Sequence, residues 1–448
     1  MIRKFARNPF LLYSPFLSFY ACIIVIKREP TLIFDEARYV QFAHNLIHGF
    51  YSPSAPHIDL WNGPGYPLIL VPFIAVHVPV LYITLLNAIF QYLAVVFLYK
   101  ALKLITSHRI AAYSALIFAV YRNALSTLPV LFTEPFTCLL ISAFVYSITL
   151  FYVKKRPGYG IAAGMLLGYI ALTKIIFGYV LMAGIFVCVA LILFRKKRVY
   201  YWGWLKILVV ALSVTVPYLT YTWHLTGKPL YWGNSGGMSL YWMSTPYEHE
   251  YGDWKVTDLT NSQYPNLFRS PDVVKILRKN HAKEIGFILK HNEIERDELF
   301  KQKAITNIEA HPMKFLANYC DNLSRMLFNF PYSYSYQDDG VLRNILIGSA
   351  ILWAALAGAV ITWVNRRKII LPVKLVLLLT GVYLLLSGAL SAYPRQFDII
   401  VPALLFWLGY LFANLKTMSL KFTKSTDLDE IDLNKLAESK LIVNGRIL

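Results

Sequence analysis

A charged stretch, Ile33-Phe34-Asp35-Glu36-Ala37-Arg38-Tyr39, directly follows the first apolar segment of the 448-residue sequence. Ionised side chains next to lipid cost free energy, so charged residues at the edge of an apolar segment are by default candidates for a functional site. A carboxylate within hydrogen-bonding reach of a hydroxyl group can take its proton, and a neighbouring arginine can bind phosphate oxygens through its planar guanidinium. The candidates in this stretch are Asp35, Glu36, Arg38 and Tyr39.

The same residues also have structural interpretations. Asp35 and Glu36 could simply begin a helix, because carboxylates are favoured at a helix N-terminus. One helix face cannot present two adjacent residues, which leaves Glu36 open between a chemical and a structural role. Arg38 could pair with either acid and have no further role.

The composition indicates which class of protein carries this stretch. The sequence is 57% hydrophobic and only 15% charged, whereas soluble domains carry roughly 25% charged residues. The chain is therefore expected to be a multi-pass membrane protein. Its net charge of +19 comes from short basic clusters between apolar runs, which indicate membrane topology rather than nucleic-acid binding. The four cysteines show neither a disulfide pattern nor metal-site spacing.

The apolar runs predict the helices that position the charged residues. A helix needs about 20 apolar residues to cross a membrane, which predicts an all-α bundle of about ten spans. Two long runs must be divided, and the divisions place Glu134 at the start of one span and Lys174 at the end of another. The predicted spans are 10–26, 82–104, 110–128, 133–153, 157–176, 177–194, 203–224, 342–364, 369–391 and 397–415.

The basic clusters orient these spans. With ten spans, all of them fall on one side except the pair Lys27-Arg28, and the positive-inside rule makes that side cytoplasmic. A second set of charged residues falls on the opposite side, which predicts an active site at the non-cytoplasmic face. This set consists of Asp35, Glu36, Arg38, Glu134, Lys174, Arg395 and Asp398.

Four regions follow from this division. Residues 1–225 form an N-terminal transmembrane module, which contains a first outer loop at 27–80. Residues 226–340 form a non-cytoplasmic segment with amphipathic helices, residues 341–415 form the last transmembrane helices, and residues 416–448 form a cytoplasmic tail.

Helices are also predicted outside the spans. In the first outer loop, residues 35–47 and 66–80 are expected to form interfacial helices, the second because three prolines interrupt a run too short to cross. In the non-cytoplasmic segment, Ser270-Pro271-Asp272 has the residue types of a helix start. Apolar residues at helical spacing predict a further helix over 315–327.

The charged stretch and several later motifs resemble those of a known superfamily. Residues Asp35–Tyr39, followed by Ala43 and Gly49-Phe50, resemble the first outer loop of the protein O-mannosyltransferase and aminoarabinose transferase superfamily, including its bacterial members. Asn62–Leu68 resembles the proline-rich entry to that superfamily's next helix. Glu134, Leu172-Thr173-Lys174 and Pro394-Arg395-Gln396-Phe397 also match. The resemblance covers residues 10–200 well and the C-terminal third loosely.

The resemblance implies a GT-C membrane glycosyltransferase that uses a polyprenyl-phosphate sugar donor. Asp35, with Glu36 beside it, would be the catalytic base in a single inverting displacement, and Arg38, Lys174 and Arg395 would bind the donor phosphate. Tyr39 and Glu134 would support them. The enzyme would be a hexosyl- or pentosyltransferase acting on a lipid, glycan or protein in a bacterial inner membrane, in contact with membrane lipids and not with nucleic acid.

Structural interpretations of the later residues remain open. Glu134, between Thr133 and Pro135, could be part of an ordinary helix start. Lys174 could extend to the lipid headgroups as an anchor, and Arg395 could bind a lipid headgroup.

No cofactor is expected, and a divalent metal has weak support. His44 and His48 share a helix face, with His57 and Asp59 nearby, but such surface pairs seldom bind zinc without further ligands. The acid and lysine that aminoarabinose transferases carry at the position of Asn62-Gly63 are absent, which argues against that substrate.

Two alternatives to a glycosyltransferase are compatible with the predicted fold. A transporter or flippase of a lipid-linked glycan is the alternative, but it should carry charges near the membrane midplane and paired broken helices. This sequence has its charges at one edge and no internal repeat. The second alternative is an inactive protein with the same fold.

Overall fold

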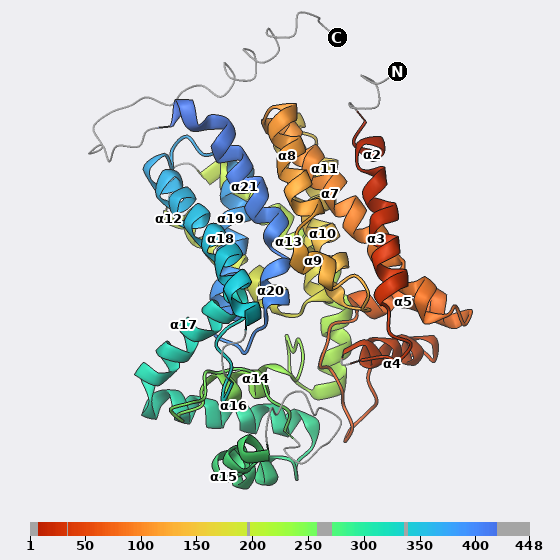
Figure 1. The fold of residues 1–448 in the computed structure, drawn as a ribbon, viewed down its shortest axis with the longest axis vertical. Helices are drawn as coiled ribbons and strands as arrows, with labels where there is room; N and C mark the ends of the chain where they lie inside the picture. Colours follow the sequence, from red (N-terminus) through yellow and green to blue (C-terminus); the bar gives the residue numbers. More distant parts are fainter. Residues whose placement is uncertain (1–7, 34, 195–197, 258–270, 336–338, 419–448) are drawn as a thin grey trace, which may run out of the picture.

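The computed structural model describes residues 8–33, 35–194, 198–257, 271–335 and 339–418, and all regular elements within these residues are helices (Figure 1). A bundle of apolar helices forms the larger part of the molecule. A smaller group of helices, α4 and α14 to α17, covers one end of the bundle, and α2 (Pro9–Leu12) lies at the other end.

Six stretches of helix are long and apolar enough to cross a membrane. The prediction of an all-α multi-pass membrane protein is therefore confirmed. The six are formed by α6 and α7 together (Val80–Thr84 and Leu86–Ile105), α10 (Thr133–Lys154), α12 (Ile176–Phe194), α13 (Arg198–Thr226), α18 (Asp339–Val364) and α19 (Leu371–Gly388). Four shorter apolar helices accompany them: α3 (Ser14–Lys27), α5 (Gly65–Ala75), α11 (Pro157–Thr173) and α21 (Val401–Asn414).

Both predicted divisions of the long apolar runs are present. Helix α11 ends at Thr173 and α12 begins at Ile176, and Lys174 between them has extended backbone angles. The second run is divided before Thr133, where α10 begins. The predicted span 110–128 differs from the structure, because it consists of α8 (His108–Ala119) and α9 (Arg122–Ser126). The extended backbone of Tyr121 separates these two helices.

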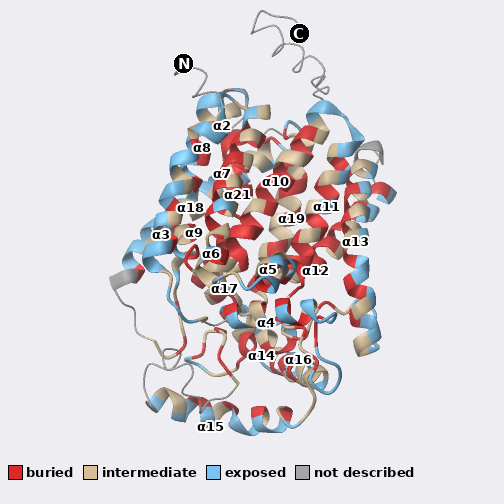
Figure 2. Ribbon diagram, turned by 90° about the vertical axis from the view of Figure 1, so that its right-hand side faces the viewer, coloured by how far each residue is buried: buried red, intermediate tan, exposed pale blue. Residues whose placement is uncertain are grey.

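Helix α10 lies at the centre of the bundle and packs against α7, α11, α19 and α21. Figure 2 shows that its residues are mostly buried, unlike those of α13 and α18 at the periphery. Its apolar residues are therefore held on all sides by other helices. This rigid central element carries Glu134 in its first turn.

The helices at the covered end match the loop predictions. Helix α4 spans Asp35–Ile47, as predicted, and α5 contains Pro72 and ends at Ala75. Helix α17 (Pro312–Phe328) includes the predicted amphipathic helix at 315–327. Helix α15 (Pro271–Ile288) begins where a helix start was predicted, although Ser270 lies outside the described residues.

Helices α14 (Gly236–Met243), α15 and α16 (Glu293–Ala310) enclose a second, smaller apolar core. Its fully buried side chains include Tyr241, Trp242 and Leu277. This core is separate from that of the bundle, so the segment after α13 has its own packing.

Candidate active site

Four charged side chains from distant parts of the sequence form a chain of ion pairs. Arg395 Nη2 donates to Asp35 Oδ2 at 2.7 Å, and Arg395 Nε lies 3.9 Å from Glu134 Oε1. Lys174 Nζ donates to the same Glu134 oxygen at 2.9 Å. Two carboxylates and two cations thus alternate in one cluster, and all four belong to the set of charged residues placed on one side in the sequence analysis.

Each member of the cluster sits at the end of a helix. Asp35 begins α4, Glu134 is in the first turn of α10, and Lys174 is the residue directly after α11. Arg395 lies in the short helix α20 (Pro394–Asp398), which precedes α21. The geometry of the cluster therefore depends on how the helix ends are packed.

The contact between Glu134 and Lys174 also shows which ends of α10 and α11 lie at the charged cluster. It brings together the N-terminal end of α10 and the C-terminal end of α11. The basic residues Lys154, Lys155 and Arg156 lie at the other ends of these two helices. They are therefore about a helix length away, at the opposite end of the bundle, as the topology prediction requires.

Burial distinguishes the two carboxylates. The side chain of Asp35 is 18% exposed, whereas that of Glu134 is 2% exposed. Burial of the Asp35 carboxyl opposes ionisation, but Arg395, Arg38 and Lys174 outweigh it and lower the pKa of Asp35 below its usual value. Asp35 is consequently an ionised carboxylate with access to solvent.

Arg38 lies at the exposed edge of this cluster. Its Nη1 is 3.4 Å from Asp35 Oδ1, its Nε is 4.0 Å from Asp59 Oδ2, and its guanidinium lies over the ring of Trp61. The side chain is 34% exposed, and both pairs are long. Arg38 therefore retains N–H groups that a ligand can reach.

Tyr39 supports the cluster from inside the protein. Its side chain is buried, its hydroxyl accepts a hydrogen bond from Asn62 Nδ2 at 3.4 Å, and its ring packs edge-on against Tyr66. Burial raises the pKa of Tyr39 well above its usual value, and the charge of Asp35 adds to this effect. The phenol is therefore neutral and fixed.

Glu36 points away from Asp35 and is fully buried. It forms an ion pair with Arg28, and its oxygens accept hydrogen bonds from the backbone N–H groups of Ile33 at 2.8 Å and Leu131 at 2.6 Å. Arg28 in turn donates to Pro129 O. This explains why the pair Lys27-Arg28 breaks the charge pattern: Arg28 neutralises a buried acid and joins the start of α4 to the loop before α10.

Two glycines let α5 approach the end of α11. A Cβ atom at Gly63 would lie 2.0 Å from Leu172 O, and one at Gly65 would lie 2.5 Å from Thr173 Oγ1. Only residues without a side chain permit this contact. Because Lys174 follows directly, these glycines set the position of one cation of the cluster.

Helix α17 holds the loop that leads to Arg395, a role that the sequence did not reveal. Asn322 Nδ2 donates to Ser387 O, Gly388 O and Leu390 O, and Asn322 Oδ1 accepts from Ala392 N. The fully buried Arg325 donates to Ala392 O at 3.1 Å. The sequence signal that could have indicated this contact is the presence of Asn322 and Arg325 among the apolar residues of the predicted helix 315–327.

Asp398 shares α20 with Arg395 but has different partners. Its side chain is buried and accepts a hydrogen bond from the hydroxyl of Tyr121 at 3.0 Å. It joins α20 to the turn between α8 and α9.

The predicted histidine pair has no metal-like surroundings. His48 Nδ1 lies 2.8 Å from His44 O rather than from the ring of His44. Among the described residues, no group of three or more His, Cys, Asp or Glu side chains could hold a metal ion.

Residues 62–221 match the family model described as dolichyl-phosphate-mannose-protein mannosyltransferase. The matched segment covers about a third of the chain and lies mostly within residues 10–200, where the sequence resembles the protein O-mannosyltransferase superfamily. No curated protein sequence matches this chain.

The chain aligns over most of its length with two solved structures of low sequence identity. One is the archaeal oligosaccharyltransferase AglB from Archaeoglobus fulgidus in complex with an inhibitory peptide and a dolichol-phosphate, with 13% identity and a TM-score of 0.43 over 96% of this chain and 54% of that chain. The other is ArnT from Cupriavidus metallidurans bound to undecaprenyl phosphate, with 13% identity and a TM-score of 0.39 over 91% of this chain and 78% of that chain. The chain thus spans about half the length of the archaeal protein.

Proposed function

We propose that this protein is a glycosyltransferase that moves a sugar from a polyprenyl-phosphate donor to an acceptor hydroxyl at the non-cytoplasmic membrane face. The observation that carries the proposal is the position of Asp35, an ionised and partly exposed carboxylate next to Arg395 and Arg38. A base and cations for a phosphate are the two requirements of this reaction.

In the proposed reaction, the acceptor oxygen attacks the anomeric carbon while Asp35 takes the acceptor proton. The bond between the anomeric carbon and the phosphate oxygen breaks, and the lipid phosphate leaves with the electron pair. The single displacement inverts the anomeric carbon. Arg38, Arg395 and Lys174 stabilise the negative charge that develops on the leaving phosphate.

The ion pair between Asp35 and Arg395 has a further consequence for the order of events. While Arg395 is hydrogen-bonded to Asp35 and ion-paired with Glu134, Asp35 is a weak base because its pKa is low. A donor phosphate that competes for Arg395 would weaken the ion pair and raise the pKa of Asp35. Donor binding would therefore make Asp35 a stronger base only when a substrate is present.

The location of the cluster supports an enzyme rather than a transporter. The four charged residues lie at helix ends at one end of the bundle, next to the covering helices α4 and α17. A transporter for a charged lipid needs polar groups near the membrane midplane. Because the basic turn between α10 and α11 lies at the other end, the positive-inside rule orients the cluster towards the non-cytoplasmic side.

Glu36 and Glu134 receive supporting roles in this proposal. Glu36 holds the start of α4 against the loop before α10 through Arg28. Glu134 holds Lys174 and Arg395 in place between them.

The direct test uses purified protein in detergent with a panel of synthetic polyprenyl-phosphate sugars, including hexoses and pentoses. We expect that one donor is consumed and that free polyprenyl phosphate appears at the same rate when a suitable acceptor is present. If every donor stays intact with lipid, glycan and peptide acceptors, the proposed function is wrong.

A further inference from the structure

We infer that a pocket between α14, α15 and α16 binds one neutral sugar unit of the acceptor, so that the acceptor is a glycan chain. The inference rests on the proposed function, because it names the substrate class for the same reaction. The pocket has a volume of about 230 Å³. Pockets for drug-sized ligands measure roughly 300–1,000 Å³, so this one suits a single ring.

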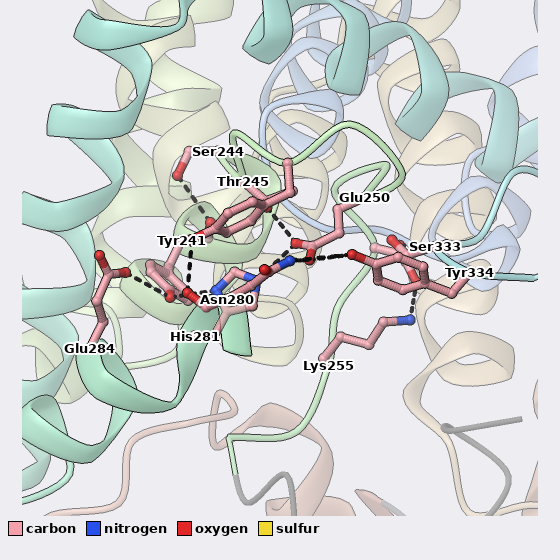
Figure 3. A network of polar contacts seen from close by, with 12 residues as sticks. Tyr241, Ser244, Thr245, Glu250, Lys255, Asn280, His281, Glu284, Ser333 and Tyr334 are labelled. Atoms are coloured by element: carbon pink, nitrogen blue, oxygen red, sulfur yellow. Dashed lines mark hydrogen bonds and ion pairs between the residues drawn. The ribbon is translucent and has the colours of Figure 1, made fainter. Parts of the chain in front are cut away.

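The back wall of the pocket is a fixed polar network (Figure 3). The buried His281 lies between Tyr241, whose hydroxyl is 2.7 Å from Nδ1, and Glu250, whose Oε2 is 2.8 Å from Nε2. The hydroxyl of Tyr241 also donates to Glu284 at 3.0 Å, and Asn280 donates to Glu250 at 2.9 Å. These contacts hold the wall in place before any ligand binds.

Charges in the pocket are balanced. Glu284 pairs with Lys303 at 2.6 Å. The pocket is also lined by His311 and by His281, whose Nε2 lies 2.8 Å from Glu250 behind the wall. An anionic ligand would have to compete with Glu284 for Lys303, and a cationic ligand would have to compete with Lys303 for Glu284. The pocket therefore favours an uncharged polar ligand.

The groups that remain accessible suit a sugar. The side chains of Glu284 and Lys303 are 34% and 35% exposed, and Thr306 adds a hydroxyl to the same wall. A carboxylate accepts hydrogen bonds and an ammonium donates them, and the Thr306 hydroxyl, which donates to Gln302 O, can accept one. This set of donors and acceptors matches a ring whose hydroxyls both donate and accept. Tyr247, with Pro246 beside it, supplies the apolar surface that the C–H face of a sugar needs.

The position of the pocket indicates a chain rather than a single sugar. Helix α16 begins at Glu293, whose carboxylate lies 3.9 Å from His57 in the first outer loop. Lys303 lies ten residues further along the same helix, which is roughly 15 Å away. A ligand that extends from the pocket to the first outer loop therefore needs more than one sugar unit.

Ligand-observed saturation-transfer NMR on the full chain in detergent tests the inference. The probes are methyl glycosides of glucose, galactose, mannose and N-acetylglucosamine at millimolar concentration, with glucuronic acid as the charged comparison. We expect a transfer signal from at least one neutral glycoside and a weaker signal from glucuronic acid. Absence of signal from every neutral glycoside, or a signal from glucuronic acid alone, would overturn the inference.

Matched variants locate the binding. Tyr247→Ala and Lys303→Met should weaken binding about tenfold, whereas Tyr247→Phe, which keeps the ring, and Lys301→Met, on the same helix outside the pocket, should not. Thermal unfolding of each variant reports whether it is folded. Equal signals from Tyr247→Ala, Lys303→Met and the unaltered protein would place the sugar elsewhere and contradict the inference.

The Asp35→Asn variant separates this inference from the proposed function. We expect it to bind the glycoside as the unaltered protein does, because Asp35 does not line the pocket. Sugar binding without consumption of any donor would contradict the proposed function and leave the pocket assignment standing. Donor consumption without sugar binding would overturn the pocket assignment alone.

Discussion

The two oxygens of Asp35 contact two different arginines, and this determines its chemistry. Arg395 approaches one oxygen at 2.7 Å and Arg38 the other at 3.4 Å. The shorter contact belongs to the arginine that also faces Glu134. Arg395 should therefore control the pKa of Asp35 more strongly than Arg38 does.

This difference predicts a shift in the pH dependence of turnover. With a pKa held below its usual value, Asp35 stays ionised as pH falls through the mildly acidic range, so its protonation does not limit the unaltered enzyme there. In Arg395→Gln the pKa of Asp35 should rise, so activity should fall at a higher pH, with a rate loss of about 10- to 1,000-fold at neutral pH. The check is kcat/KM for the donor measured from about pH 4.5 to 8, because this quantity reports ionisation in the free enzyme.

The matched variant is Arg38→Gln, which should shift the acidic limb by less. An acidic limb at the same pH in Arg395→Gln and in the unaltered protein would show that Arg395 does not set the pKa of Asp35.

Glu36 provides a second prediction, because its neighbours indicate a structural role. Glu36→Gln removes the charge that balances the buried Arg28, and breaking a buried ion pair in this way costs about 3–5 kcal/mol. We expect a lower thermal unfolding temperature and a turnover loss that follows the loss of folded protein. Replacing both partners, as in Glu36→Gln with Arg28→Met, should recover part of the stability.

A Glu36→Gln protein with unchanged unfolding temperature and no turnover would instead support the catalytic role that the sequence suggested for Glu36. Sequence reasoning left this residue open because local spacing shows only that adjacent residues face different ways. Glu36 has two partners, the side chain of Arg28 and the backbone N–H of Leu131. Leu131 is 95 positions away in the sequence.

At the scale of elements, the fit of α5 against α11 sets the position of Lys174. Gly63→Ala would place a Cβ atom 2.0 Å from Leu172 O, a backbone atom that cannot move without shifting the end of α11. We expect a loss of about 1–3 kcal/mol in stability and at least about a tenfold loss in kcat. Thermal unfolding and donor turnover measure the two effects.

Gly158→Ala, at the opposite end of α11, is the control. A Cβ atom there has no neighbour within 4 Å, so both quantities should stay unchanged. Full activity in Gly63→Ala would mean that the close contact does not position Lys174.

Helix ends that are marked by particular residue types nearby were predicted correctly, whereas the break between α8 and α9 was not predicted. The bounds of α4 and the division between α11 and α12 follow from acids, a lysine and the length of the apolar run. The division of span 110–128 into α8 and α9 depends on the backbone of Tyr121, whose side chain reaches Asp398 across 277 positions. That contact has no signature within the local sequence.

In the whole molecule, different groups of charged residues lie at the two ends of the helix bundle. The ionic cluster and the covering helices lie at one end of the bundle, and the basic turn between α10 and α11 lies at the other. This arrangement predicts which residues are accessible from each side of the membrane.

Cysteine labelling in intact cells or right-side-out vesicles tests this orientation. In a variant without the four native cysteines, Ser54→Cys in the first outer loop and Ser239→Cys in α14 should react with a membrane-impermeant maleimide from outside. Ser107→Cys, in the turn before α8, should react only after the membrane is opened. Labelling of Ser54→Cys or Ser239→Cys only from the cytoplasmic side would reverse the proposed orientation.

The Asp35→Asn variant shows whether Asp35 removes the acceptor proton. Donor consumption and donor affinity are compared between the unaltered protein and Asp35→Asn, with the polyprenyl-phosphate sugar that the panel identifies. We predict that kcat falls by about 100- to 10,000-fold while the donor is bound about as tightly and the protein stays folded. A folded Asp35→Asn protein that transfers sugar at a near-normal rate would contradict the account.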